Sequence, residues 1–277
     1  LMTHLTRRTL NHTLAGLFAL SAACMALPLS AHADAYPSKP ITLVVPNPPG
    51  GLVDTSARLV SDPLARLIGQ SVVVDNKPGG SGNLAYSLVA RSPKDGYTVL
   101  VSYSGYHIAN PILMDKLPWE LKDLTPVGLI TVATNVIAVH PSVPANTLKE
   151  FIAWAKQNPG ALMLGSTGMG STPHLAMEEL LGAQQISYTH IPFKGTTDQM
   201  LALASGTIMA GMNSTGFAPW VEQGKLRLLA VFSEQRSARW PQVPTMKELG
   251  FAQAIYHSPW GLVAPTGTPA NVIALLH

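Results

Sequence analysis

The chain has 277 residues, a formal net charge of +3 and only 12% charged residues, about half the usual share. Its pI near 9.0 would suggest nucleic-acid binding. However, two arginines lie in an N-terminal leader, and the remainder holds 16 basic and 15 acidic residues, so no basic surface for a phosphate backbone is expected. Glycine and proline, 23 of each, are spread along the chain, which is typical of a loop-rich globular protein.

The first 33 residues have the features of an export signal. A pair of arginines (Arg7–Arg8) precedes an apolar stretch at 14–29 that is too short for a membrane span, and a small-residue cleavage motif ends at Ala33. We predict cleavage after Ala33 and a periplasmic location, reached by the Sec route or, because the arginine pair fits a loose twin-arginine pattern, by the twin-arginine route. Cys24, the only cysteine, lies in this leader, so no disulfide is expected in the exported part.

After the leader, strand-like segments alternate with helical ones, which predicts βαβ units and mainly parallel sheets. In the first half, the predicted strands are 41–45, 71–75 and 98–102, and the predicted helices are 55–68 and 83–91.

The second half repeats this alternation. Its predicted strands are 135–140, 161–165, 186–191, 208–212, 226–232 and 260–264, and its predicted helices are 147–158, 173–181 and 197–205. Thr147 and Glu150 form a capping box at the start of one helix. The final segment, 271–277, has the pattern of an amphipathic helix cut short, so we expect the C-terminus to be incomplete.

Two α/β series predict two lobes. We expect the first lobe to contain 34–134 and 235–277, and the second lobe to contain 135–234. Ligands of such sheets bind beyond the carboxyl ends of the strands.

The loops after the strands are rich in Gly, Ser, Thr and Asn and lead into helices. The clearest is Pro46–Asp54. A helix N-terminus presents free N–H groups and a partial positive charge, and glycine lets a ligand approach the backbone. Several such ends at one cleft would hold a small anion with few charged side chains, which favours a receptor for an organic acid over an enzyme.

Candidate ligand contacts follow from these loops. Gly51, Leu52 and Val53 are expected to donate backbone N–H groups, with Leu52 or Val53 against the ligand's carbon skeleton, while Asp54 either caps its helix or contacts the ligand. Tyr106 is expected to line the cleft, and Asn213 is expected to donate from its amide. Thr167, Gly168 and Ser171 either bind a second carboxylate or form a plain capping loop. Lys194 either attracts the anion or is simply solvated.

Eight short motifs extend in order over the whole exported chain. They are Tyr36–Ile41, Pro48–Asp54, Asn76–Asn83, Asp95–Thr98, His190–Gly195, Gly224–Arg227, Val243–Thr245 and Ala264–Pro269. Together they resemble the periplasmic substrate-binding proteins of tripartite tricarboxylate transporters, the Bug-type receptors.

This resemblance implies a two-lobed, type II Venus-flytrap fold that closes on a small carboxylate and delivers it to membrane permease subunits. We expect a monomer without cofactor or metal. The resemblance also puts Ser104 in a ligand-contacting loop and Asp198 near the cleft, where an acid could receive an ammonium group or order water. The ligand class stays open among dicarboxylates, tricarboxylates, aromatic acids, acidic amino acids and neutral amides.

Other classes of function fit less well. Ser171, His190 and Asp198 could in principle form a hydrolase site, but no Gly-x-Ser-x-Gly motif is present. The histidines are scattered without the paired spacing of a metal site. A receptor that serves a signalling system would have the same fold as a transport receptor.

Overall fold

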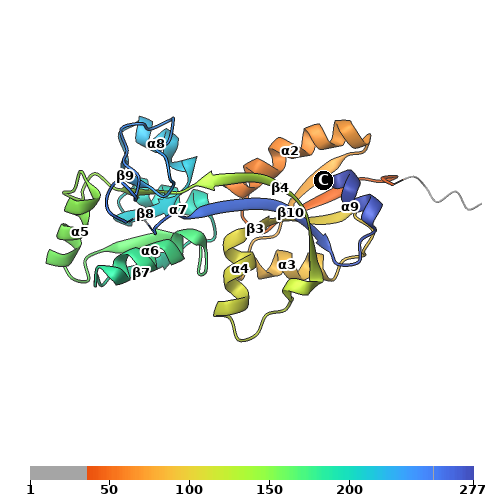
Figure 1. Ribbon diagram of the computed structural model, residues 1–277, viewed down its shortest axis with the longest axis horizontal. Helices are drawn as coiled ribbons and strands as arrows, with labels where there is room; N and C mark the ends of the chain where they lie inside the picture. The colour runs from red at the N-terminus through yellow and green to blue at the C-terminus, as the bar shows by residue number, and fades with distance from the viewer. Residues whose placement is uncertain (1–35, 252) are drawn as a thin grey trace, which may run out of the picture. The chain divides into compact units, whose positions relative to one another are not determined.

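The computed structural model describes residues 36–251 and 253–277. The predicted export signal and its cleavage site lie outside these residues. Among the described helices, none combines the length and the apolar character that a membrane crossing needs. From Pro37 onward the chain is built on two five-stranded sheets (Figure 1).

The first sheet has the strand order β2-β1-β3-β10-β4. Its strands are β1 (Ile41–Val45), β2 (Val72–Asn76), β3 (Thr98–Tyr103), β4 (Leu124–Thr134) and β10 (His257–Pro265). β1 pairs in parallel with β2 and β3, whereas β10 runs antiparallel to β3 and β4. Four strands share one direction and β10 opposes them, so two pairings are parallel and two are antiparallel, and the sheet is mixed where the sequence predicted a mainly parallel one.

Apolar strands and amphipathic helices build the core around this sheet. β1 reads Ile-Thr-Leu-Val-Val with four of its five residues buried, the pattern of a strand covered on both faces. The helices are α2 (Leu52–Ile68), α3 (Asn83–Ala90), α4 (Ser104–Leu113) and α9 (Ala270–Leu276), with a short 3-10 helix, η2 (Leu121–Asp123). In α2 the buried residues Val53, Ala57 and Ser61 recur every four positions, so they share one face of the helix.

The second sheet has the strand order β7-β6-β8-β5-β9, in which β5 alone opposes the other strands. Its strands are β5 (Val136–Val139), β6 (Met163–Ser166), β7 (Thr189–Pro192), β8 (Ala210–Asn213) and β9 (Arg227–Val231). Its helices are α5 (Leu148–Gln157), α6 (Thr172–Ala183), α7 (Thr196–Ala204) and α8 (Ala218–Glu222), with the 3-10 helix η3 (Thr215–Phe217).

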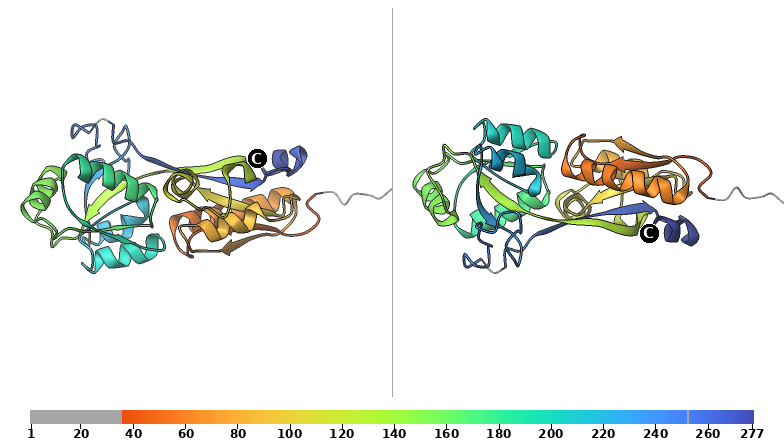
Figure 2. Two further views of the ribbon diagram at one scale, coloured as in Figure 1. Left: turned by 90° about the horizontal axis from the view of Figure 1, so that it is seen from below. Right: turned by 90° about the horizontal axis from the view of Figure 1, so that it is seen from above.

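Two crossings connect the sheets. β4 leads into β5 through Asn135, and the chain returns from β9 to β10, which lies beside β4 along its whole length (Figure 2). Asn135 Nδ2 donates to Tyr256 O (2.9 Å) and to Ser258 Oγ (3.0 Å), so side-chain bonds join the two crossing segments.

The segment between β9 and β10 packs against the second sheet. Met246 is fully buried in a cluster with Ile137 and Phe232, and Trp240 and Val243 lie in the neighbouring cluster. These contacts favour grouping 235–256 with the second sheet instead of with the first lobe, to which the sequence assigned it. The lobe boundaries stay a prediction.

Candidate functional site

A small cavity lies where loops of the two sheets meet. Its volume is about 20 Å³. The lining residues from the first sheet and its connections are Asn47, Leu52, Val53, Tyr103, Asn135, Ser258 and Trp260, and those from the second are Thr167, Pro173, Thr196, Asn213 and Ser214. Three of these residues belong to helix starts, because Leu52 begins α2, Pro173 is the second residue of α6 and Thr196 begins α7. The first N–H groups of each helix have no partner within the helix.

Three polar atoms of the lining residues are buried without a hydrogen-bond partner. They are Asn47 Oδ1, Ser214 Oγ and Trp260 Nε1. Their residues are 6%, 2% and 5% exposed. Among the described lining residues none is charged. Because buried polar groups in proteins are normally paired, three free ones on one cavity indicate a site for a polar ligand group.

Local structure holds each of these atoms in place. Asn47 follows β1, and Asn76 Nδ2 donates to its backbone oxygen (2.9 Å). Trp260 lies in β10 next to a β-bulge and immediately before Gly261, where a Cβ atom would lie 2.6 Å from Gly128 O. Glycine is therefore required at 261 for the close contact between β10 and β4 beside Trp260.

A buried amide network supports the second-sheet side of the cavity. Gln199 Nε2 donates to Gly165 O (2.7 Å) and to Met212 O (3.0 Å), and Asn213 Nδ2 donates to Gln199 Oε1 (2.6 Å). Asn213 Oδ1 accepts from Ser214 N (2.8 Å), which leaves the Ser214 hydroxyl as the free group of this loop. Asn213 thus lines the cavity and positions Ser214.

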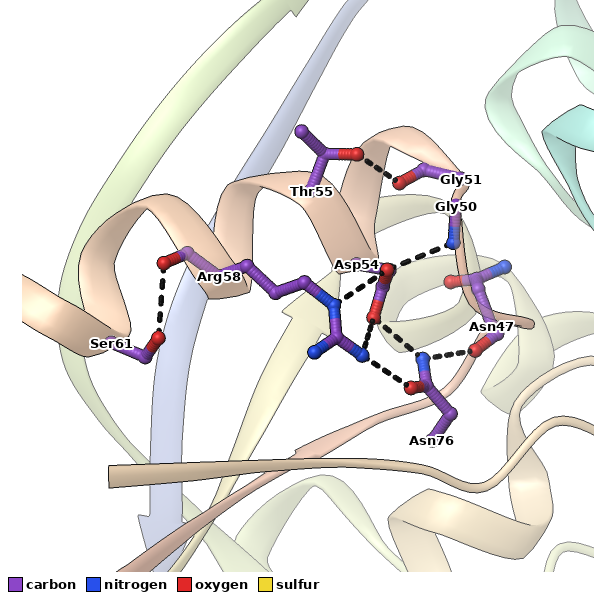
Figure 3. A network of polar contacts seen from close by, with 8 residues as sticks. All are labelled: Asn47, Gly50, Gly51, Asp54, Thr55, Arg58, Ser61 and Asn76. Carbon is purple, nitrogen blue, oxygen red and sulfur yellow. Dashed lines mark hydrogen bonds and ion pairs between the residues drawn. The ribbon is translucent and has the colours of Figure 1, made fainter. Parts of the chain in front are cut away.

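Asp54 lies in a polar network at the start of α2 (Figure 3). Its carboxylate accepts from Gly50 N (2.8 Å) and Asn76 Nδ2 (2.9 Å), and Arg58 NH2 lies 3.0 Å from Oδ1. Burial alone would raise the pKa of Asp54, but the hydrogen bonds from Arg58, Gly50 and Asn76 outweigh burial and hold the pKa below its usual range. The N-cap of α2 is Gly51 and no side chain caps it, so Asp54, the third residue of the helix, does not take the capping position; its carboxylate instead reaches back to Gly50 N, which precedes the helix.

Direct contacts join the two sides around the cavity. Tyr106 Oη donates to Thr167 O (2.7 Å), and Thr172 N donates to Tyr103 Oη (3.1 Å). Burial raises the pKa of both phenols, which keeps them protonated. A Cβ atom on Gly105 would lie 2.8 Å from Thr172 N, so glycine permits this close approach.

Two stacked histidines contact the Ser166–Ser171 loop. The rings of His174 and His190 are 4.1 Å apart, and His190 Nε2 is 2.7 Å from Ser166 Oγ. Burial, together with the neighbouring His174, lowers the pKa of His190 to about 4. The described residues contain no group of three His, Cys, Asp or Glu side chains that could hold a metal ion.

The predicted site residues fall into three groups. Those that line the cavity are Leu52, Val53, Thr167 and Asn213. Those that lie beside it are Gly51, Tyr106, Gly168 and Ser171. The Cβ position of Gly51 is 3.9 Å from Thr196 Cβ, and Tyr106 donates to Thr167 O. Ser171 caps α6, and its hydroxyl donates to Gly168 O. Those that lie elsewhere are Asp54 in its network, Ser104 on a separate apolar groove, and the exposed Lys194 and Asp198. Their roles in ligand binding stay predictions.

Several lining residues were absent from the predicted site. Asn47, Thr196 and Ser214 lie in or beside the predicted strand-end loops, and that position was the available signal. Asn135, Ser258 and Trp260 belong to the crossing segments, and no local sequence pattern marks them as neighbours of those loops.

Comparison with known proteins places the chain in a family. A family model described as the tripartite tricarboxylate transporter family receptor matches residues 56–277. BugT of Bordetella pertussis is 36% identical over 266 residues, covering 95% of this chain and 80% of BugT. A Rhodopseudomonas palustris protein solved with adipate has a TM-score of 0.84 at 34% identity, covering 87% of this chain and 81% of that one. MatC of the same species, with bound malate, has a TM-score of 0.82 at 30% identity, covering 87% and 83%. This chain belongs to the tripartite tricarboxylate transporter receptor family, a family of periplasmic solute receptors with two lobes.

Proposed function

We propose that the protein binds a small carboxylate in the cavity between its two sheets and delivers it to the membrane subunits of a tripartite transporter. The observation that carries this proposal is the pair of buried donors without a partner, Ser214 Oγ and Trp260 Nε1, on a cavity bordered by three helix starts. A carboxylate accepts hydrogen bonds from hydroxyl, indole and backbone N–H groups alike.

Neutral donors are sufficient for this task. Burying a carboxylate without partners costs several kcal/mol, and each hydrogen bond to a charged group returns about 1.5–3 kcal/mol. Two or three such bonds from helix starts and side chains offset the cost without a buried arginine or lysine. Leu52, Val53 and Pro173 supply the apolar surface for the carbon skeleton.

Ligand entry requires the two sides to separate. A cavity of about 20 Å³ has room for about one water molecule, which is far less than any dicarboxylate needs. We infer that the contacts between Tyr106 and Thr167 and between Tyr103 and Thr172 break when the receptor opens. A ligand then shifts the equilibrium through its contacts with both sides.

Two relatives support the ligand class, since their structures were solved with adipate and with malate. We propose export with cleavage after Ala33, by the Sec or the twin-arginine route, and a monomeric receptor that has no catalytic role and docks on permease subunits.

Thermal unfolding of the exported chain against succinate, adipate, malate, citrate, benzoate, glutamate and the matching amides tests the proposal. A ligand at about 100 times its dissociation constant adds about 2.7 kcal/mol to the free energy of unfolding. Leu52→Asp puts a negative charge on the cavity wall and should abolish the shift. The matched control is Leu59→Asp in the same helix, where the side chain is 71% exposed, and it should keep the shift. No shift with any of these compounds would contradict the proposal.

A further inference from the structure

Trp260 carries a buried indole N–H group that has no partner in the described chain. The residue is 5% exposed, and its Nε1 atom is inaccessible to solvent. An indole N–H only donates, so the missing partner must be an acceptor. Since buried tryptophans usually find a partner, this donor requires an explanation.

The backbone of Trp260 is held between two neighbouring strands. Trp260 pairs with Tyr103 on one side and with Thr131 on the other, next to the β-bulge at Gly261. The indole therefore belongs to a strand held by two neighbours. The position of its backbone is set by the sheet and does not depend on a loop.

Ser214 brings a second unpaired group to the same cavity from the other sheet. Its backbone N–H is bonded to Asn213 Oδ1, which fixes the loop and leaves Oγ without a partner. The cavity has the size of about one water molecule. A single ligand atom placed there would consequently be in reach of side chains from both sheets.

We propose that Trp260 and Ser214 form a donor pair for one acceptor group of the ligand and that this pair determines ligand specificity. This inference rests on the proposed function. The pair accepts a carboxylate or carbonyl oxygen and rejects an ammonium group, which has no lone pair to offer the indole. Because its two members come from different sheets, the acceptor group also holds the receptor closed.

Tryptophan fluorescence gives a direct readout. The chain has five tryptophans, and Trp260 is the one that lines the cavity among the described residues. The probe is whichever of succinate, adipate, malate and citrate the wild-type protein binds most tightly. Its binding should change the emission spectrum, and Trp260→Phe should remove that change. The matched control is Trp240→Phe, which alters a buried tryptophan in the core of the second sheet and should keep it.

Binding affinities of Trp260→Phe, Ser214→Ala and the double variant test the pairing. Each single variant should weaken binding of the same probe by about 10-fold or more, the loss expected for one hydrogen bond to a charged group. The double variant should lose less than the product of the two single losses, since both donors serve one group. Ser205→Ala is the control, because this exposed serine lies at the end of α7.

The outcomes separate the two proposals. Single variants that bind the probe within about twofold of wild type, or a fluorescence change that survives in Trp260→Phe, would overturn the donor pair and leave the receptor function standing. Strictly multiplicative losses would overturn the shared acceptor group. A folded wild-type protein that binds none of the compounds would overturn the proposed function and this inference with it.

Discussion

At the scale of single residues, the buried polar side chains near the cavity divide into supports and free groups. The side-chain amide of Gln199 donates hydrogen bonds to backbone oxygens of β6 and β8 and accepts one from the amide of Asn213. These bonds hold the ends of the two strands in place. Ser214 and Trp260 keep one group free. Mutation of a supporting residue should change the position of an unpaired group. Mutation of a residue that carries an unpaired group should remove a ligand contact directly.

Asp54 holds a hydrogen-bond network together, and we expect its substitution to lower the stability of the fold. Asp54→Asn keeps the shape of the side chain but removes the negative charge of the carboxylate, to which Arg58, Gly50 and Asn76 donate hydrogen bonds. We expect urea unfolding to give a free energy about 1–3 kcal/mol below that of wild type. Asp62→Asn, an exposed position in the same helix, is the control and should stay near the wild-type value. Equal stability of the two variants would mean that the network of Asp54 contributes little.

His190 should make stability depend on pH. The stacked ring of His174, the Ser166 hydroxyl and the nearby Glu178 surround it, and its pKa in the folded protein is about 4, against about 6.5 in an unfolded chain. As the pH falls below about 6.5, His190 binds a proton in the unfolded chain but stays neutral in the folded protein. The contribution of His190 to stability is therefore fully present above about pH 6.5 and is lost as the pH falls toward 4.

The expected loss is about 1–2 kcal/mol between pH 7.5 and pH 5, measured by urea unfolding at both values. His190→Gln should reduce this difference, while His257→Gln, at an exposed position on β10, should not. If His190→Gln leaves the pH dependence of stability unchanged, other groups must cause that dependence. His174 would be the first candidate, because burial lowers its pKa as well.

At the scale of elements, the site depends on how closely the helix starts of the two sheets approach. Glycines make these approaches possible. Besides Gly105 against Thr172, a Cβ atom on Gly195 would lie 2.9 Å from Pro48 Cδ. Neither glycine lies in the left-handed region, since Gly195 has an extended φ of 177°, so space alone explains the residue at both positions.

Gly105→Ala should therefore weaken ligand binding more than it weakens the fold. The added methyl group meets backbone atoms of Thr172 and Ser171, at 2.8 and 3.1 Å, and would push α4 away from α6. We expect affinity for the bound carboxylate to fall about 10-fold or more in calorimetric titration. Gly182→Ala is the matched control, since no atom lies within 4 Å of its Cβ position and alanine favours the helix by about 1 kcal/mol. Unchanged affinity in Gly105→Ala would show that closure tolerates the methyl group.

Sequence patterns predicted most elements because each is coded locally. The strand at 41–45 has the predicted bounds, and Thr147 caps α5 as predicted, with its side chain accepting from Glu150 N. α4 was missed because Pro111 and the absence of a capping side chain weaken its helical pattern. β4 was missed because Pro126 and Gly128 are atypical of a strand, although both are tolerated where β4 forms the edge of the sheet.

The site was predicted in part for the same reason. Leu52, Val53, Thr167 and Asn213 belong to loops whose composition is visible in the sequence, and they line the cavity. Trp260 and Asn135 reach it through pairing across the sheet and through the crossing segments, which depend on contacts more than 100 residues apart. Local composition carries no information on such contacts.

At the scale of the whole molecule, the connection between the sheets decides how the cavity opens. Only two crossing segments lead from one sheet to the other in the described part of the chain, and Asn135 joins them by its bonds to Tyr256 and Ser258. We expect the sheets to separate through backbone changes near these segments. The contacts across the cavity, in contrast, are single hydrogen bonds and glycine contacts that can break and reform.

A disulfide across the cavity should test whether opening is required. The Cβ position of Gly51 lies 3.9 Å from Thr196 Cβ, within the range of natural disulfides, and Gly51 has an ordinary φ of −76° that accepts a side chain. In the exported chain, which starts after Ala33 and contains no other cysteine, oxidised Gly51→Cys/Thr196→Cys should bind carboxylates at least about 10-fold more slowly than the reduced form, because the cavity of about 20 Å³ cannot admit them while the sides are joined. The measurement is the association rate by stopped-flow fluorescence before and after reduction, with Gly51→Ser/Thr196→Ser as the control for side-chain volume. Equal rates in the oxidised and reduced forms would mean that ligands enter without separation of the two sheets at this point, and the route would then have to lie on the side of Tyr106 and Thr167.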